Sequence, residues 1–200
     1  MATWNLLNAD DPTVARTAIS AAAGNVTGSN VTDYGADPTG ATDSTAAIEA
    51  AFAVSGNIYF PPGTYQYNGT GLDGDMSRIV GSGQEYTTIN LGASSYLMDR
   101  ADAINRVVLS DFTVIGGKGT FRHTYTSTNV VWDFLVQNIR FKDYTECAIA
   151  SDSTDAPYWR IQNCIFDAAD CENTIGIAFT GWTDNTAIEN CGFRRNRVDV

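Results

Sequence analysis

The stretch Ile161-Gln-Asn-Cys-Ile-Phe166 is one of four copies of a short phrase in the second half of the chain. The other copies are Leu109-Ser-Asp-Phe-Thr-Val114, Val136-Gln-Asn-Ile-Arg-Phe141 and Ile188-Glu-Asn-Cys-Gly-Phe193. Their third residues stand at positions 111, 138, 163 and 190, so successive copies are separated by 27, 25 and 27 residues. A near-constant period between about 20 and 50 residues is typical of a repeat architecture.

Each copy also indicates its own geometry. Positions 1, 4 and 6 are apolar or cysteine, and all three can face one core only if the chain bends between positions 1 and 4. The bend falls at position 3, an Asp or Asn, a residue type that tolerates the left-handed backbone conformation. Strand, corner and strand, repeated at this period, predict successive coils of a parallel β-helix whose asparagines form a ladder. Four unrelated hairpin strands are the alternative, and the agreement of phrase, spacing and corner favours the β-helix.

The composition is that of a folded domain with a substantial core. The chain has 200 residues and a formal net charge of −11, which argues against nucleic acid or an anionic membrane as a partner. No apolar run is long enough to span a bilayer. The opening Met1-Ala-Thr-Trp-Asn5 lacks the basic start and apolar centre of a signal peptide, so we expect export by another route or release by lysis.

The cysteines allow two interpretations. Cys164 and Cys191 occupy the same position of consecutive phrases, and Cys147 and Cys171 each follow an acidic residue. At the spacing of adjacent coils either pair could form a disulfide. Free, buried cysteines in a small apolar stack are the alternative that we favour. Because the chain has no CxxC motif or Cys/His cluster, we predict neither a metal site nor a cofactor.

The chain divides into two predicted parts. Residues 1–30 are expected to form a short helical arm and a linker, with Asp11-Pro12 at the start of the helix and Gly24-Asn25 at its end. Residues 31–200 are expected to form the N-terminal portion of the solenoid. We expect this portion to be incomplete at its C-terminal end, because the last phrase is followed by no capping segment.

Residues 31–90 carry a specific resemblance. The matching features are the run Asp33-Tyr34-Gly35-Ala36, Gly40 and Asp43, an Ala/Ile-rich helix, and Phe60-Pro-Pro-Gly-Thr-Tyr65. This segment resembles the opening of the pectate-lyase-like superfamily, as found in bacteriophage tailspikes and capsule depolymerases. The resemblance implies an all-β, right-handed parallel β-helix whose N-terminal end is covered by the helix. In that family the segment is a scaffold and holds no catalytic residue.

Chemistry is expected in the unequal loops between the phrases. Glu146 and Asp170 stand at nearly matching positions, five residues after Phe141 and four after Phe166. On adjacent coils their carboxyl groups could approach the separation of retaining glycosidases, about 5–5.5 Å, or of inverting ones, about 6.5–9.5 Å. We therefore predict Glu146 and Asp170 as a catalytic pair, one with a raised pKa. Ordinary acidic loop residues remain the alternative. Further candidates are Asp143, Asp167 and Glu172.

Aromatic side chains between the phrases are candidates for stacking on sugar rings. We predict such substrate contacts for Trp132, Tyr144 and Trp182. Trp159, in contrast, follows the same stack as Val107 and Phe134 and is expected to be internal. His123 is the only histidine, and a lone histidine is no catalytic signature.

These observations favour a bacteriophage tailspike or tail fibre that binds and depolymerises a bacterial capsular polysaccharide, exopolysaccharide or lipopolysaccharide, as a glycoside hydrolase or lyase acting outside the cell. The resemblance implies a homotrimer in the virion, in contact with other tail or baseplate proteins. One alternative is a non-catalytic segment that links a receptor-binding region to the virion. Another is a secreted polysaccharide lyase or hydrolase.

Overall fold

The computed structural model describes residues 28–74, 77–93, 95–101, 104–124, 131–152, 158–169, 174–180 and 185–196. The predicted N-terminal helix and Cys171 lie outside these residues. No helix within the described ranges is long and apolar enough to cross a membrane.

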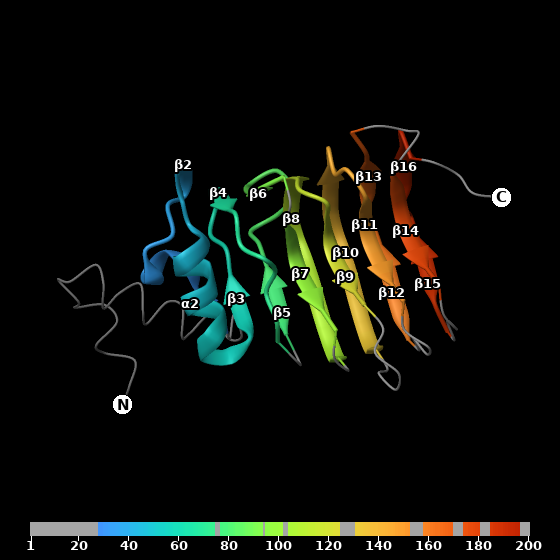
Figure 1. Ribbon diagram of the computed structural model, residues 1–200, viewed down its shortest axis with the longest axis horizontal. Helices are drawn as coiled ribbons and strands as arrows, with labels where there is room; N and C mark the ends of the chain where they lie inside the picture. The colour runs from blue at the N-terminus through green and yellow to red at the C-terminus, as the bar shows by residue number, and fades with distance from the viewer. Residues whose placement is uncertain are drawn as a thin grey trace, which may run out of the picture.

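The strands wind into a parallel β-solenoid with three faces, and every strand pair in it is parallel. The first face contains β1 (Ser29–Asn30), β3 (Asn57–Tyr59), β5 (Arg78–Val80), the first halves of β8 (Ile104–Gly116) and β10 (Val131–Lys142), β12 (Trp159–Gln162) and β15 (Ala187–Glu189). The second contains β2 (Thr39–Asp43), β4 (Gly63–Tyr67), β6 (Thr87–Leu91), the second halves of β8 and β10, β13 (Ile165–Asp167) and β16 (Gly192–Arg194). The third contains β7 (Tyr96–Arg100), β9 (Gly119–His123), β11 (Cys147–Ser151) and β14 (Ile175–Phe179). In Figure 1 the coils follow one another along the long axis, from blue to red.

The four phrases occupy the predicted places, one on each of four successive coils. Their first residues are in register, with Val136 paired to both Leu109 and Ile161. The Asp or Asn corners all have a left-handed backbone, with φ of 66°, 53°, 55° and 52° from the first phrase to the last. Asn138 Nδ2 also donates a hydrogen bond to Asp111 Oδ1 at 2.9 Å. The predicted fold and its polar corner are therefore confirmed.

The core consists of side chains stacked from coil to coil. The rings of Phe141, Phe166 and Phe193 lie parallel, with 4.7 Å between each pair of neighbouring centroids. A second stack places the ring centroids of Phe134 and Trp159 4.1 Å apart, and Trp159 is fully buried, as predicted. These stacks hold the coils together because stacking removes apolar ring faces from water.

The α-helix α2 (Thr45–Ser55) packs against the first coil at the N-terminal end of the solenoid (Figure 1). Its Ile48, Ala51 and Phe52 are buried, following the i, i+3, i+4 spacing of one helix face. Asp43 Oδ1 accepts hydrogen bonds from both the backbone N–H and the hydroxyl of Thr45. A 3-10 helix, η1 (Val31–Tyr34), precedes it. The structure therefore confirms the capping helix.

The described cysteines are free. Cys147 and Cys164 are buried, and Cys191 is half-buried beside the core. Burial raises the pKa of the Cys164 thiol to about 12, so it stays protonated at neutral pH. The interpretation as a small apolar stack is therefore confirmed for Cys164 and Cys191.

Candidate functional site

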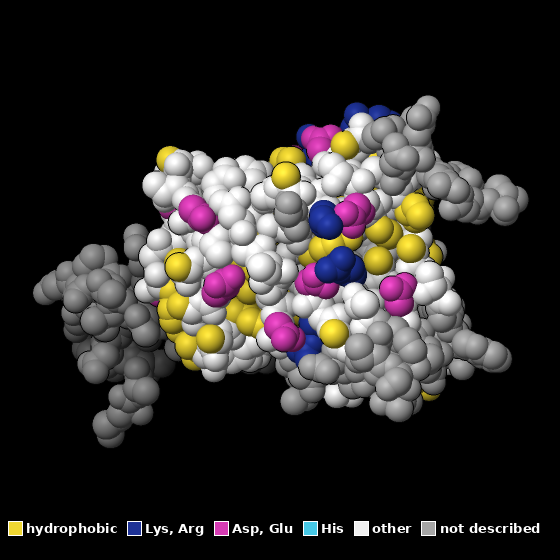
Figure 2. Space-filling model, in the orientation of Figure 1, with side chains coloured by type: hydrophobic (Ala, Val, Ile, Leu, Met, Phe, Trp, Pro, Cys, Tyr) yellow, Lys and Arg dark blue, Asp and Glu magenta, His cyan; other side chains and the backbone are white. Residues whose placement is uncertain are grey.

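The third face carries a group of charged and aromatic side chains at its surface. Figure 2 shows basic side chains next to acidic ones in the middle of the viewed face, with hydrophobic side chains between them. We call this group the charged face and define it by Tyr96, Asp99, Lys118, Arg122 and Glu146. The charged face draws on three successive coils, those of β7, β9 and β11.

Glu146 is the centre of the charged face. It lies immediately before β11, and 47% of its side chain is exposed. Lys118 Nζ lies 2.9 Å from Oε1, and the Tyr96 hydroxyl donates to Oε2 at 2.9 Å. The backbone N–H of Glu146 also donates to the carbonyl of Lys118 at 3.0 Å, so parallel pairing of the coils places the two side chains together.

A second ion pair lies next to the first. Asp99 and Arg122 are register partners on β7 and β9, and Arg122 Nε donates to Asp99 Oδ1 at 2.8 Å. Arg122 NH2 contacts the other carboxylate oxygen. The Arg122 guanidinium also lies over the ring of Tyr96, 4.7 Å from its centroid. Tyr96 is only 3% exposed, so this cation–π contact covers the ring and leaves its hydroxyl directed to Glu146.

These contacts set the protonation states. The hydrogen bond from Lys118, together with the one from Tyr96, lowers the pKa of Glu146 against the opposing effect of burial. Burial and the neighbouring Glu146 raise the pKa of Tyr96, so its hydroxyl remains a donor. At neutral pH Glu146 is therefore an ionised, accessible carboxylate, the form that acts as a nucleophile, a base or an electrostatic stabiliser. A general acid would have to come from another group.

Of the predicted site residues, the structure places Glu146 in the charged face. Asp170 and Trp182 lie outside the described residues, as does the side chain of Trp132, whose backbone pairs with Asn105. The predicted substrate contact of Tyr144 is wrong. Tyr144 is 2% exposed and its hydroxyl contacts Asn196 Oδ1, so its ring is not available to stack on a sugar. The physical reason is the corner at Asp143, with a φ of 53°, after which Tyr144 is buried in the core.

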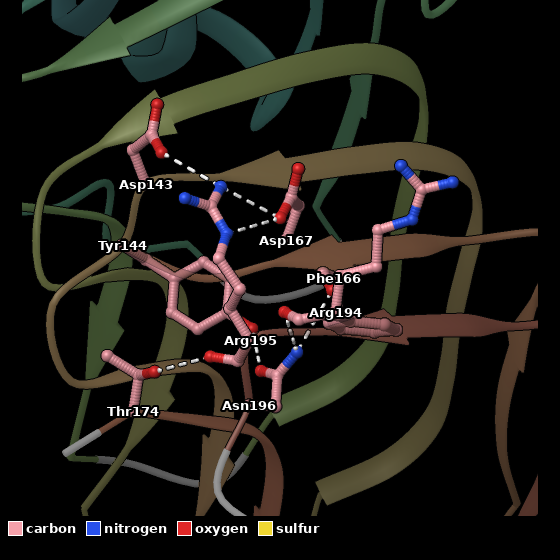
Figure 3. A network of polar contacts seen from close by, with 8 residues as sticks. All are labelled: Asp143, Tyr144, Phe166, Asp167, Thr174, Arg194, Arg195 and Asn196. Carbon is pink, nitrogen blue, oxygen red and sulfur yellow. Dashed lines mark hydrogen bonds and ion pairs between the residues drawn. The ribbon is translucent and has the colours of Figure 1, made fainter. Parts of the chain in front are cut away.

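Two further carboxylates that were candidates for the site, Asp143 and Asp167, form ion pairs with Arg195. Figure 3 shows Asp143 and Asp167 on either side of the Arg195 guanidinium. Arg195 NH2 lies 2.9 Å from Asp167 Oδ1 and 3.6 Å from Asp143 Oδ1. Arg195 thus neutralises carboxylates on two other coils. This cluster ties three coils together at one edge.

Sequence reasoning missed most of the charged face. Tyr96 and Asp99 precede the first phrase, so no repeat signal marked their coil position. Arg122 belongs to none of the phrases, and its sequence neighbour His123 is fully buried. The signal that could have found the ion pair is the separation of 23 residues between Asp99 and Arg122, close to one coil. Among the described residues, no three His, Cys, Asp or Glu side chains are grouped so as to hold a metal ion.

Comparisons with known proteins identify relatives. A curated relative, α-1,3-galactosidase A from Peterkaempfera griseoplana, is 30% identical over 135 residues, which make up 63% of this chain and 17% of that protein. Among solved structures, the A-module of mannuronan C-5 epimerase AlgE6 from Azotobacter vinelandii has a TM-score of 0.60 and 16% identity, over 82% of this chain and 56% of that one. The pre-mature gene product 12 of bacteriophage phi29 has a TM-score of 0.52 and 19% identity, over 82% of this chain and 29% of that one.

At these identities the structural likenesses show the fold alone. The chain also spans well under two thirds of each of these relatives. The family model described as "Rhamnogalacturonase A/epimerase, pectate lyase-like" matches residues 28–199, which is well over half of the chain. The chain therefore belongs to the rhamnogalacturonase A/epimerase family of pectate-lyase-like proteins.

Proposed function

We propose that this chain is part of a bacteriophage tailspike or tail fibre that binds and depolymerises a bacterial surface polysaccharide, with the charged face as its reactive surface. The observation that carries the proposal is Glu146, an exposed carboxylate held in its ionised form by Lys118 and Tyr96. An exposed anion stabilised by two donors from other coils is suited to attack on, or stabilisation of, a positively charged sugar ring in a transition state.

The proposed reaction is cleavage of a glycosidic bond. Glu146 would act as the nucleophile or as the base that activates water, and a protonated carboxylic acid would deliver a proton to the leaving oxygen. Asp170, on the following loop, is our candidate for this acid. Tyr96 and Lys118 position the Glu146 carboxylate. Arg122, with Asp99, keeps the Tyr96 ring in place and presents a guanidinium edge to the same surface.

The substrate class is supported by family membership and by the curated relative. The chain belongs to a family described by a rhamnogalacturonase and an epimerase, and the 30% identical relative is a galactosidase. The virion location, the trimer and the tail or baseplate partners rest on the resemblance of residues 31–90 to tailspikes. In this proposal residues 1–30 form an arm, and residues 31–200 form the N-terminal portion of the solenoid.

The test is a depolymerisation assay on the full-length protein with a panel of purified capsular polysaccharides. Both reactions create new reducing ends; unsaturated non-reducing ends beside them indicate a lyase, and their absence indicates a hydrolase. We expect Glu146→Gln to lower the rate on the cleaved polysaccharide by about 10²-fold or more, because the substitution keeps the shape and removes the charge.

The matched control is Glu85→Gln. Glu85 also forms an exposed ion pair, at 2.9 Å with Arg140, but it does not belong to the charged face. Its variant should cleave as the wild type does. Full activity of Glu146→Gln would remove the charged face from the mechanism. If the wild-type protein binds a polysaccharide but produces no new reducing ends and no unsaturated products, the chain would instead be the non-catalytic structural segment.

A further inference from the structure

The first face carries an open pocket of about 430 Å³ on a different sheet from the charged face. Its lining residues are Asp133, Phe134, Leu135, Tyr158, Arg160 and Gln162. They come from β10, β12 and the corner residue Tyr158 that precedes β12. A volume of this size accommodates one or two sugar rings.

Tyr158 is the unusual member of the pocket. It has a left-handed backbone with φ of 64°, and 54% of the residue is exposed. The equivalent corners of the other coils, by strand register, are Arg106, Asp133 and Asn185, with φ of 48°, 53° and 55°. The solenoid therefore requires a left-handed residue here, and Asn or Asp adopts that conformation more easily than a bulky aromatic residue.

More than half of Tyr158 is exposed, at a corner with a left-handed backbone. Its hydrophobic stabilisation is limited by exposure, whereas its backbone conformation is unfavourable. The position therefore suits a side chain with a role at the surface. A half-buried leucine, Leu135, forms an apolar part of the pocket beside the tyrosine.

The polar groups of the pocket match the edges of a sugar. Arg160 is exposed on β12, and Asp133 lies on the rim, 3.2 Å from Arg106 Nε. Gln162 Nε2 donates to Gln137 Oε1 at 3.0 Å, which fixes the orientation of this side chain. A guanidinium, a carboxylate and an amide together supply donors and acceptors for hydroxyl groups. The lining holds one cation and one anion, which favours an uncharged ligand.

We infer that this pocket is an accessory carbohydrate-binding site that takes neutral hexopyranose residues, one ring stacking on Tyr158. The choice of ligand rests on the proposed function, whereas the site itself rests on the geometry of the pocket. A glycan held on the first face leaves the charged face on the third face open to neighbouring chains. Such a second contact raises the local concentration of substrate around the protein.

The test is two-dimensional NMR of the full chain with three neutral probes: maltotetraose, nigerotetraose and α-1,3-galactobiose. We expect at least one probe to shift the resonances of Tyr158, the Arg160 guanidinium and the Gln162 amide. Oligogalacturonate, an acidic probe, should leave these resonances in place. If none of the neutral probes shifts them, the inference is overturned.

The decisive variant is Tyr158→Asn. It removes the ring and installs the residue that the next coil has at Asn185, so the thermal midpoint should stay equal or rise. Affinity for the neutral probe should fall about tenfold, the effect of losing one aromatic contact. Arg160→Gln, a substitution in strand β12, should also weaken binding. Wild-type affinity in Tyr158→Asn would overturn the inference.

The outcomes separate this inference from the proposed function. If Glu146→Gln stops cleavage while Tyr158→Asn binds glycan as the wild type does, the accessory site fails and the function survives. If the neutral probe binds at Tyr158 and no polysaccharide is cleaved, the accessory site survives and the enzymatic proposal fails.

Discussion

The hydroxyl of Tyr96 donates a hydrogen bond to Oε2 of Glu146 at 2.9 Å, although 50 residues separate them in the sequence. Lys118, on the coil between them, contacts the other carboxylate oxygen at 2.9 Å. The Glu146 carboxylate and the two side chains that contact it thus come from three successive coils. Parallel pairing makes this arrangement possible, because each coil places its residues beside the equivalent residues of the next.

The charge of Lys118 should control the pH dependence of cleavage. Lys118 is the largest cause of the lowered pKa of Glu146. With a lowered pKa, the active carboxylate persists to lower pH and is lost only as the pH falls through that pKa. Lys118→Met should therefore raise the pKa and move the acidic limb of the kcat/KM profile to higher pH. Lys142→Met, which removes a positive charge elsewhere, should leave that limb in place. An unchanged limb in Lys118→Met would contradict the proposed role of Glu146.

The corner at Asn138 should prefer glycine to alanine. Asn138→Ala loses the hydrogen bond to Asp111. It also places alanine, which tolerates the left-handed conformation less well than asparagine, at a φ of 53°. We therefore expect a loss of about 1–3 kcal/mol in the free energy of unfolding. Asn138→Gly loses the same hydrogen bond but accepts the left-handed conformation, so it should cost about 1 kcal/mol less. Urea denaturation measures both. Equal losses would show that the corner conformation is not a source of strain.

The phenylalanine stack should be strongest where it is buried. Phe166 lies between Phe141 and Phe193 and is fully buried, so Phe166→Ala should lower the free energy of unfolding by about 3–5 kcal/mol. Phe193, which is 48% exposed, is the control, and Phe193→Ala should cost clearly less. The two variants can be compared by thermal and chemical denaturation. A larger loss in the free energy of unfolding for Phe193→Ala than for Phe166→Ala would contradict the link between burial and stacking strength.

Gly119 should tolerate no side chain. A Cβ at this position would lie 1.7 Å from the carbonyl oxygen of Cys147 and 2.9 Å from Cε1 of Tyr96. Gly119→Ala should therefore separate β9 from β11, lower the melting temperature and displace Tyr96 from Glu146. Gly192→Ala, whose Cβ would meet no atom within 4 Å, is the matched control and should behave as the wild type. Hydrogen exchange of the β11 amides would locate the change.

The scaffold was more predictable than the site because its signal repeats. The phrases revealed the period, the corner and the inward positions, and Cys164 and Trp159 are buried where those positions placed them. The site residues repeat only loosely. Glu146 was found because it follows a phrase at a recognisable distance. Tyr144, two residues earlier, was wrongly assigned to the surface because the pattern does not say which way a side chain points after the second corner.

The sequence by itself determined the parallel β-helix and its capping helix. The physical reason is that apolar periodicity and left-handed corner residues are local properties that recur with each coil. Only the tertiary structure decided which polar residues meet. Tyr96, Lys118 and Glu146 converge because three successive coils pair in parallel, so their contacts depend on the stacking of whole coils. The protonation of Glu146 follows from that stacking, since its donors lie on other coils and no local sequence pattern encodes them.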